Sequence, residues 1–261
     1  MIQRVSRASR RIQQTFTQFD NGAEILGALA RHKDELVFQI PGGVTIACPN
    51  VAGSRVPVYE IFAEDAYRLG WFTAGLADDF TALDIGGHIG CFSVALATLK
   101  PQVKIWTYEA SPTTAVYTRR NVESNGLGDR VTVTNVAVSS TAGTLSFADN
   151  AGGSGLNGIT APTGTKTIDI EAITFADAKA RAGGSVQVVK IDTEGAEYDI
   201  VLGSDPADWA DVQRVVLEHH DVPGHAWAEL ESFFASAGLT IAAREDVTER
   251  LGTVWLSRTP L

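Results

Sequence analysis

Acidic and glycine residues follow an apolar segment near the middle of the chain. The run Ala-Leu-Asp-Ile-Gly-Gly-His-Ile-Gly over residues 82–90 places Asp84 two residues before Gly86, and Gly90 four residues after it. Glycine lets a backbone approach a ligand closely, because a Cβ would intrude. The spacing differs from the Gly-x-Gly-x-x-Gly pattern of a dinucleotide loop. A carboxylate here would repel a pyrophosphate but would suit a cationic amino group.

A second acid, Glu109, ends the next apolar segment. An acid at this place in a nucleotide-binding sheet accepts the ribose hydroxyls of an adenosine. S-adenosylmethionine (SAM) carries an adenosine, an amino group and a sulfonium, so the two acids together predict SAM as the ligand. Taken alone, each feature also fits a tight turn or a solvated acid. The predicted cofactor-binding residues are Asp84, Gly86, Gly90, Glu109, Asn135, Ala137 and Asp192, with 135–137 placed near the adenine by topology.

Acids and histidines follow two later apolar segments. Asp192 comes directly after one of them, and Glu218 and His220 follow the other. Residues i and i+2 of a strand share a face, so we expect Glu218 to orient the His220 imidazole. An imidazole with an ordinary pKa of about 6.5 suits a general base at neutral pH. The predicted catalytic residues are His220, Asp192 and Glu218, with His219 as the alternative base and Asp192 contacting the methionyl part of SAM or the acceptor.

The same groups offer ligands for a divalent metal ion. Carboxylates with one imidazole suit Mg²⁺ or Mn²⁺, and Asp192, Glu194, Glu218 and His220 form such a set. A bound ion would acidify a hydroxyl, as it acidifies water. No ligand spacing here is diagnostic, so a metal stays an alternative that the sequence does not favour.

The elements that must position these residues follow from the apolar pattern. From about residue 80 onward, short apolar runs alternate with helical patterns, which predicts a doubly wound α/β fold around a mostly parallel sheet. Continuous apolar runs are typical of strands that are buried on both faces. We expect strands at residues 80–85, 103–108, 131–136, 186–191, 214–217, 239–243 and 253–257, and helices at residues 90–100, 112–123, 196–202 and 226–237.

Two regions interrupt this alternation. Residues 1–79 are expected to form an N-terminal cap, and residues 80–261 the domain that holds the site. Within the cap, Glu60, Glu64 and Tyr67 lie on a helical pattern on which Glu60 and Glu64 are four residues apart. This helix is either a lid that closes over SAM or a helix with a solvated face. Residues 149–165 are rich in Gly, Ser and Thr and predict a long loop, which is either a functional lid or disordered.

The charge balance limits the partners. The 261 residues include 21 Lys and Arg against 31 Asp and Glu, a net charge of −10. Nucleic acids and anionic membranes bind basic surfaces, so neither is expected as a partner. No apolar run reaches the roughly 18 residues of a membrane helix. The two cysteines, Cys48 and Cys91, indicate a reduced, cytoplasmic protein.

The N-terminal segment, residues 1–19, is basic but lacks the apolar centre of a secretory signal. Its apolar residues are near helical spacing, which predicts a helix that packs on its own domain or on the second subunit of a homodimer. An Arg- and Ser-rich organelle transit segment is the alternative.

Several of these segments together resemble the FkbM family of SAM-dependent methyltransferases. They are Leu83-Asp-Ile-Gly-Gly-His-Ile-Gly90, Tyr108-Glu-Ala-Ser-Pro112, Asn135-Val-Ala-Val138, Val189-Lys-Ile-Asp-Thr-Glu-Gly-Ala-Glu197 and Val216-Leu-Glu-His-His220. The segment that begins at Val189 is the most specific. The resemblance covers about residues 55–256. It departs from the family pattern at His88, where many members have a small or polar residue.

The resemblance implies a class I methyltransferase sheet, which is Rossmann-like with seven strands and the last one antiparallel, and SAM as methyl donor. Family members typically methylate hydroxyls of small metabolites such as sugars and polyketides. The implied function is therefore O-methylation of a hydroxylated small molecule in secondary metabolism. The alternatives are a methyltransferase for protein or another macromolecule, a dinucleotide-dependent oxidoreductase and a non-catalytic partner protein. The glycine spacing counts against a dinucleotide, and the net charge against nucleic acid.

Overall fold

A seven-stranded sheet forms the centre of the protein in a computed structural model, which describes residues 2–51, 53–149, 167–248 and 251–261. Its spatial order is β11 (Thr240–Thr248), β12 (Leu251–Ser257), β10 (Arg214–His219), β9 (Val188–Ile191), β3 (Thr81–Ile85), β4 (Lys104–Tyr108) and β5 (Val131–Thr134). The strands from β10 to β5 pair in parallel, whereas β12 is antiparallel to both β10 and β11. The expected doubly wound, mostly parallel fold class is confirmed.

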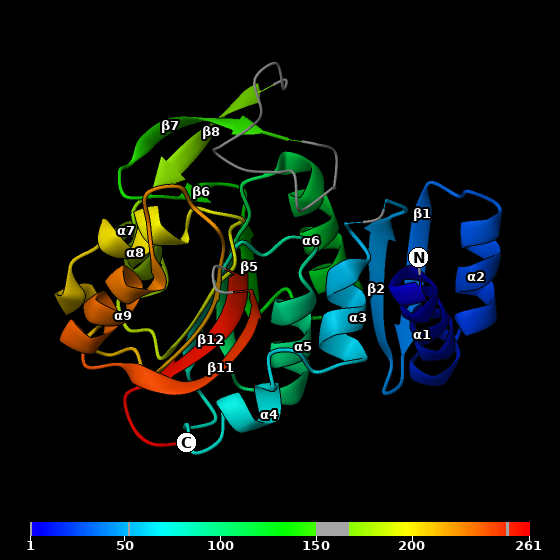
Figure 1. The fold of residues 1–261 in the computed structure, drawn as a ribbon, viewed down its shortest axis with the longest axis horizontal. Coiled ribbons are helices and arrows are strands. Elements are labelled where there is room, and N and C mark those ends of the chain that lie inside the picture. The colour runs from blue at the N-terminus through cyan, green and yellow to red at the C-terminus, as the bar shows by residue number, and fades with distance from the viewer. Residues whose placement is uncertain (1, 52, 150–166, 249–250) are drawn as a thin grey trace.

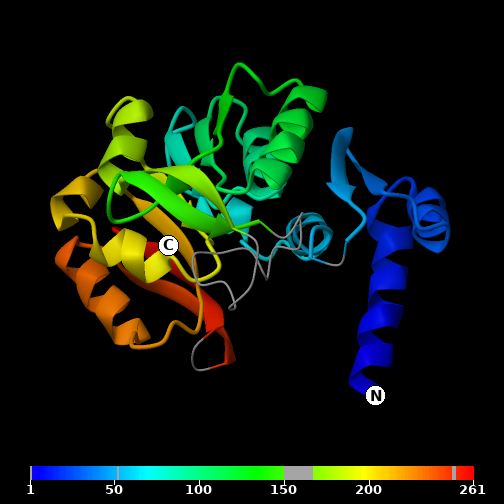
Figure 2. The same cartoon turned by 90° about the horizontal axis from the view of Figure 1, so that it is seen from above.

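Helices cover both faces of this sheet (Figures 1 and 2). One face carries α5 (Cys91–Leu99) and α6 (Pro112–Ser124), and the other carries α7 (Phe175–Arg181), α8 (Glu197–Leu202) and α9 (Trp227–Ser236). Consecutive strand residues point to opposite faces. Ala82 accordingly belongs to one buried cluster and Leu83 to the other. Burial on both faces explains why these strands are continuous apolar runs.

The N-terminal residues form a helical and hairpin unit at one side of the sheet (Figure 1). Its elements are α1 (Ile2–Gln18), α2 (Gly22–Ala30), the hairpin β1 (Glu35–Ile40) and β2 (Val44–Pro49), α3 (Val56–Phe62) and α4 (Leu69–Phe72). The helical pattern over residues 58–72 is broken between α3 and α4, where Asp65 and Arg68 have φ values of 47° and 51°. The Asp65 side chain accepts a hydrogen bond from the Leu69 backbone N–H, which starts α4.

Two asparagines, Asn121 in α6 and Asn125 at the C-terminal cap of this helix, attach the hairpin to the sheet layer. The Asn121 side chain bonds both backbone groups of Ala47 and the carbonyl of Ile89, and Asn125 bonds both backbone groups of Thr45. One buried cluster also runs from Phe19 in the N-terminal unit to residues of the sheet. The boundary expected at residues 79/80 stays a prediction, and this core crosses it.

A small second sheet, which the sequence did not indicate, follows β5. It consists of β6 (Ala137–Val138), β8 (Thr167–Ile173) and β7 (Gly143–Ala148), in that order. The strand expected over residues 131–136 ends at Thr134, because the Asn135 side chain donates to the carbonyls of Glu109 and Ala110 and the chain turns there. The loop predicted over residues 149–165 lies, beyond Asp149, outside the described residues. Among the residues described, no helix combines the length and apolarity needed to cross a membrane.

The anchor between α6 and the hairpin generates a stability prediction. Asn121→Ala removes three hydrogen bonds and leaves buried backbone groups unpaired, so it is expected to lower the free energy of unfolding by about 2–4 kcal/mol. Urea denaturation measures the change. Gln102→Ala, at an exposed turn position, is the control and should have almost no effect. Equal effects of the two substitutions would contradict the anchoring role.

Candidate active site

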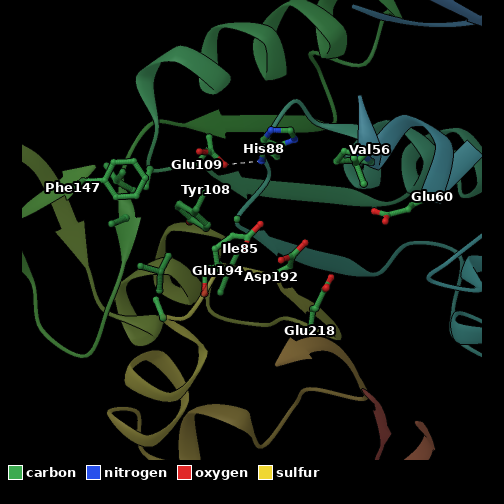
Figure 3. Close-up of a pocket in the computed structure, with 18 residues that line it drawn as sticks. Val56, Glu60, Ile85, His88, Tyr108, Glu109, Phe147, Asp192, Glu194 and Glu218 are labelled. Atoms are coloured by element: carbon green, nitrogen blue, oxygen red, sulfur yellow. Dashed lines mark hydrogen bonds between the residues drawn. The ribbon is translucent and has the colours of Figure 1, made fainter. Parts of the chain in front are cut away.

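A cavity of about 200 Å³ lies at the carboxyl ends of the central strands (Figure 3). Its floor is formed by the residues that end or follow β3, β4 and β9, and its sides by α3 and the small sheet. Open α/β sheets bind ligands in this position, where the strand order reverses. Its lining residues are Val56, Pro57, Glu60, Ile85, Gly86, His88, Tyr108, Glu109, Ala110, Val136, Ala137, Val138, Phe147, Asp192, Thr193, Glu194, Ala196 and Glu218.

The glycine loop between β3 and α5 is held by backbone contacts. Gly86 has a φ of +79°, and a Cβ added to it would lie 1.8 Å from the carbonyl oxygen of Asp192. The backbone N–H groups of Gly86 and Gly87 both donate to the carbonyl of Tyr108. Gly90 has a φ of +87° and lies against Thr118. The loop therefore needs glycine for its conformation and for the close approach of β3 to β9, and of these glycines only Gly86 lines the cavity.

Glu109 lies in the cavity wall as a firmly held carboxylate. Its Oε1 accepts hydrogen bonds from the Ser111 backbone N–H and the Thr114 hydroxyl, both at 2.8 Å, and its Oε2 accepts one from the His88 backbone N–H at 2.6 Å. Burial raises the pKa of Glu109, although these donors favour the ionised form. Because the donors come from the glycine loop and from the start of α6, the carboxylate has a fixed position at the cavity edge.

Asp84 is placed behind the cavity and does not line it. Its side chain is fully buried, its Oδ2 accepts a hydrogen bond from the Ser93 hydroxyl at 2.6 Å, and its Oδ1 lies 3.1 Å from the ammonium of Lys190. Asn135 likewise uses its amide on backbone carbonyls, while Ala137 lines the cavity. Four of the predicted cofactor residues, Gly86, Glu109, Ala137 and Asp192, thus line the cavity, whereas Asp84, Gly90 and Asn135 support its walls.

Asp192 occupies the other end of the cavity. Its Oδ2 accepts a hydrogen bond from the Tyr67 hydroxyl at 3.1 Å and lies 3.9 Å from the ammonium of Lys190. Burial, with the nearby Asp192 carboxylate, raises the pKa of Tyr67 well above its ordinary value, so Tyr67 keeps its proton and donates. Glu60, from α3, lines the same end of the cavity (Figure 3).

The carboxylates that contact His220 differ from the expected partner. Its Nδ1 lies 3.1 Å from Glu197, the first residue of α8, and its Nε2 lies 3.3 Å from Glu194 in the turn before that helix, whereas Glu218 was expected to orient it. The reason is that β10 ends at His219, so His220 leaves the strand and the i, i+2 rule no longer applies. Burial disfavours its charged form, but the hydrogen bond to Glu197 and the nearby acids outweigh this and raise the pKa of His220 to about 9.

Glu218 and His219 have opposite surroundings. Glu218 lines the cavity, and burial together with the charge of Asp192 raises its pKa to about 8. His219 is fully buried beside Trp227, and neither ring nitrogen has a hydrogen-bond partner among the described residues. Burial lowers the pKa of His219. His219 and His220 line a second cavity, and Glu218 is not among the residues that line it.

One group of side chains has the spacing of a metal site. Single ligand atoms of Asp192, Glu194 and His220 lie within 4.8 Å of one another. Both ring nitrogens of His220 already face carboxylates at 3.1 and 3.3 Å, so a protonated imidazole satisfies this group without an ion. A divalent metal ion at this group therefore stays an alternative that is not favoured, as it was from the sequence.

Two contributors to the site were not predicted from the sequence. Lys190 carries a charge inside an otherwise apolar strand, and this interruption was a signal that pointed to a buried ion pair. Phe147 reaches the cavity wall from a distant segment, and no local pattern marks it. Tyr67 was expected near the site as part of a possible lid, but its hydrogen bond to Asp192 was not predicted.

Comparison with known proteins gives consistent matches. The sequence profile described as the Methyltransferase FkbM domain matches residues 84–240, more than half of the chain. The chain is 28% identical over 241 residues to 31-O-demethyl-FK506 methyltransferase FkbM of Streptomyces tacrolimicus, covering 80% of this chain and 90% of that protein. It is 26% identical over 216 residues to the methyltransferase sdnD of Sordaria araneosa, covering 70% and 80%.

The fold resembles a solved structure of methyltransferase FkbM from Methylobacillus flagellatus KT. The TM-score is 0.51 at 14% identity, and the match covers 77% of this chain and 52% of that chain. The chain therefore spans about half the length of that structure, and the likeness supports the fold.

The crowding at Gly86 generates the prediction for this site. Gly86→Ala should be more destabilising than Gly126→Ala by roughly 2 kcal/mol or more, because both positions have positive φ but only Gly86 would place a Cβ against the backbone. Urea denaturation of the two variants separates the clash from the conformational cost. Similar losses of stability would show that the approach of β3 to β9 relaxes freely.

Proposed function

The chain belongs to the FkbM methyltransferase family, and on that premise we propose that it transfers the methyl group of SAM to a hydroxyl oxygen of a small molecule. The observation that carries the proposal is a cavity at the strand ends with a fixed carboxylate, Glu109, at one edge and Asp192 and Glu218 at the other. The name of the Streptomyces relative describes methylation at an oxygen, which supports an oxygen acceptor here. Because the family is one of methyltransferases, we no longer consider a dinucleotide-dependent oxidoreductase as the alternative function.

The residues of the cavity fit SAM, the methyl donor of this family. Glu109 is placed to accept the ribose hydroxyls through its remaining lone pairs, and Ala137, Val138 and Phe147 offer an apolar wall for the adenine. The opposite end is acidic, and no Lys or Arg is among the lining residues that the structure describes. Carboxylates favour a ligand that carries a sulfonium and an ammonium group.

The acceptor hydroxyl then belongs beside Asp192 and Glu218. When bound, SAM supplies an electrophilic methyl carbon, which an oxygen attacks in line with the sulfur. Asp192, held by Tyr67, is placed to accept a hydrogen bond from the acceptor and so to orient it. Alcohols are weak nucleophiles, so a base should accept the hydroxyl proton as the new bond forms.

Geometry and ionisation favour Glu218 over His220 as that base. Glu218 lines the cavity, and with a pKa of about 8 its ionised form, which is the one that accepts a proton, becomes populated as the pH rises from neutrality through 8. His220, with a pKa of about 9 and two carboxylate contacts, is protonated there, and it positions Glu194 and Glu197. His219 is buried away from the cavity.

Membership of the family does not define which molecule accepts the methyl group. A hydroxylated small molecule is the proposed partner. The expected homodimer, the cytoplasmic location and the absence of nucleic-acid and membrane partners stay predictions.

Calorimetric titration with SAM tests the proposed site. Glu109→Ala should weaken SAM binding at least about tenfold, or about 1.4 kcal/mol, because it removes a charge-assisted acceptor for the ribose. Glu123→Ala, an exposed acid on α6, is the matched control and should bind as the parent does. EDTA should leave the affinity unchanged, since the acidic group is satisfied without an ion. A folded parent protein that binds neither SAM nor its demethylated product would contradict the proposed function.

The raised pKa of Glu218 predicts a pH-dependent stability. Its pKa in the folded protein, about 8, lies above the ordinary value of about 4.3, so its contribution to stability is present below pH 4.3 and is lost as the pH rises through 8. Glu218→Gln mimics the protonated form and should raise the free energy of unfolding at pH 8.5, relative to its effect at pH 5, by about 1–3 kcal/mol.

Urea denaturation at the two pH values measures this difference. The control Glu123→Gln, at an exposed position, should give the same change in stability at both. A pH-independent effect of Glu218→Gln would mean that the pKa of Glu218 is not raised in the folded protein, and would contradict its assignment as a base that titrates near neutrality.

A further inference from the structure

Lys190 is a charged side chain at the centre of the sheet, and the chemistry proposed above assigns it no role. It lies in β9 between the buried residues Val189 and Ile191, and it is only 4% exposed. Removing an ammonium from water costs several kcal/mol unless the charge is paired and hydrogen-bonded. Its presence here therefore depends on its partners.

The ammonium contacts three groups from different parts of the site. It donates a hydrogen bond to the Gly86 carbonyl at 2.5 Å, lies 3.1 Å from Asp84 Oδ1, and lies 3.9 Å from Asp192 Oδ2. An ammonium has three donors and no acceptor, which suits three oxygen partners. Burial opposes the charged form, but the carboxylates, Asp84 first, outweigh it and raise the pKa of Lys190.

The contact with Gly86 connects Lys190 to the cofactor side of the cavity. Gly86 lies in the loop whose His88 backbone N–H donates to Glu109, so the position of the Gly86 carbonyl affects where that donor lies. The contact with Asp192 connects the same ammonium to the acceptor side of the cavity. There the Tyr67 hydroxyl donates a hydrogen bond to the same carboxylate.

We propose that Lys190 is a positioning residue that fixes the glycine loop and Asp192 relative to each other, so that SAM and the acceptor meet in the correct geometry. This inference rests on the proposed function, because it takes the cavity to be the SAM site. Asp84 acts through Lys190 in this arrangement: it neutralises the buried ammonium and does not touch the cofactor. The competing explanation is that the pair only stabilises the core.

Two variants separate these explanations. Lys190→Met removes the ammonium and leaves Asp84 as an unpaired buried charge, so it should lower stability as well as SAM affinity. The double variant Lys190→Met with Asp84→Asn removes both charges. The asparagine side-chain oxygen can still accept the hydrogen bond from the Ser93 hydroxyl, so much of the lost stability should be recovered. Lys179→Met is the matched control, because Lys179 also pairs with an acid, Asp211, but its other partner is the Asp208 carbonyl and not the glycine loop or Asp192.

The measurements are SAM affinity by calorimetry, stability by urea denaturation and amide hydrogen exchange of the loop at residues 86–90. In the double variant, SAM affinity should stay at least about tenfold weaker than in the parent and loop exchange should be faster, even though stability is recovered. The Lys179→Met control should lose stability alone.

Two outcomes would overturn these conclusions at different levels. Parent-like SAM affinity and loop exchange in the stable double variant would show that Lys190 only neutralises Asp84, and would overturn this inference while the proposed function stands. A parent protein that is folded but binds no SAM would contradict the proposed function and this inference with it. Because the double variant does not leave a buried charge unpaired, the test does not depend on the folding of Lys190→Met.

Discussion

The close approach of β3 to β9 at their carboxyl ends is the constraint on which the site depends. Only a residue without a Cβ fits at Gly86, because the backbone of Asp192 occupies the space that a side chain would need. This approach brings together the loop that follows one strand and the acids that follow the other. The cavity lies above this junction, where helices depart in opposite directions from neighbouring parallel strands.

The electrostatics of the site follow from that junction. Several acids lie where the strand ends meet, and two cations compensate their charge. Lys190 lies beneath the glycine loop, and His220, directly after β10, contacts the acids that follow β9. Glu218 has neither partner within hydrogen-bonding distance among the described residues, and its pKa rises. The same site thus contains a protonated imidazole, His220, and a carboxyl group that titrates near neutrality, Glu218, because their surroundings differ.

The sequence was a good guide to elements that are buried on both faces and a poor one to contacts between distant segments. The strand around Leu83 and the loop at Gly86 were predicted, because apolar runs and glycine spacing are local signals. The partner of His220 was not, since His220 lies just beyond the end of β10 at His219. The small sheet was missed because β7 and β8 are partly exposed and do not form continuous apolar runs. The contact of Tyr67 with Asp192 was not predicted because only the folded chain brings these residues together.

The helix α6 has a different kind of contact at each end. Its first turn holds Glu109 through Ser111 and Thr114, and its last turns hold the hairpin through Asn121 and Asn125. By thermodynamic linkage, a ligand that binds only when Glu109 is in place also favours every state in which α6 is intact. Occupancy of the cavity therefore protects the N-terminal hairpin against local unfolding and proteolysis, although no hairpin residue is among those that line the cavity.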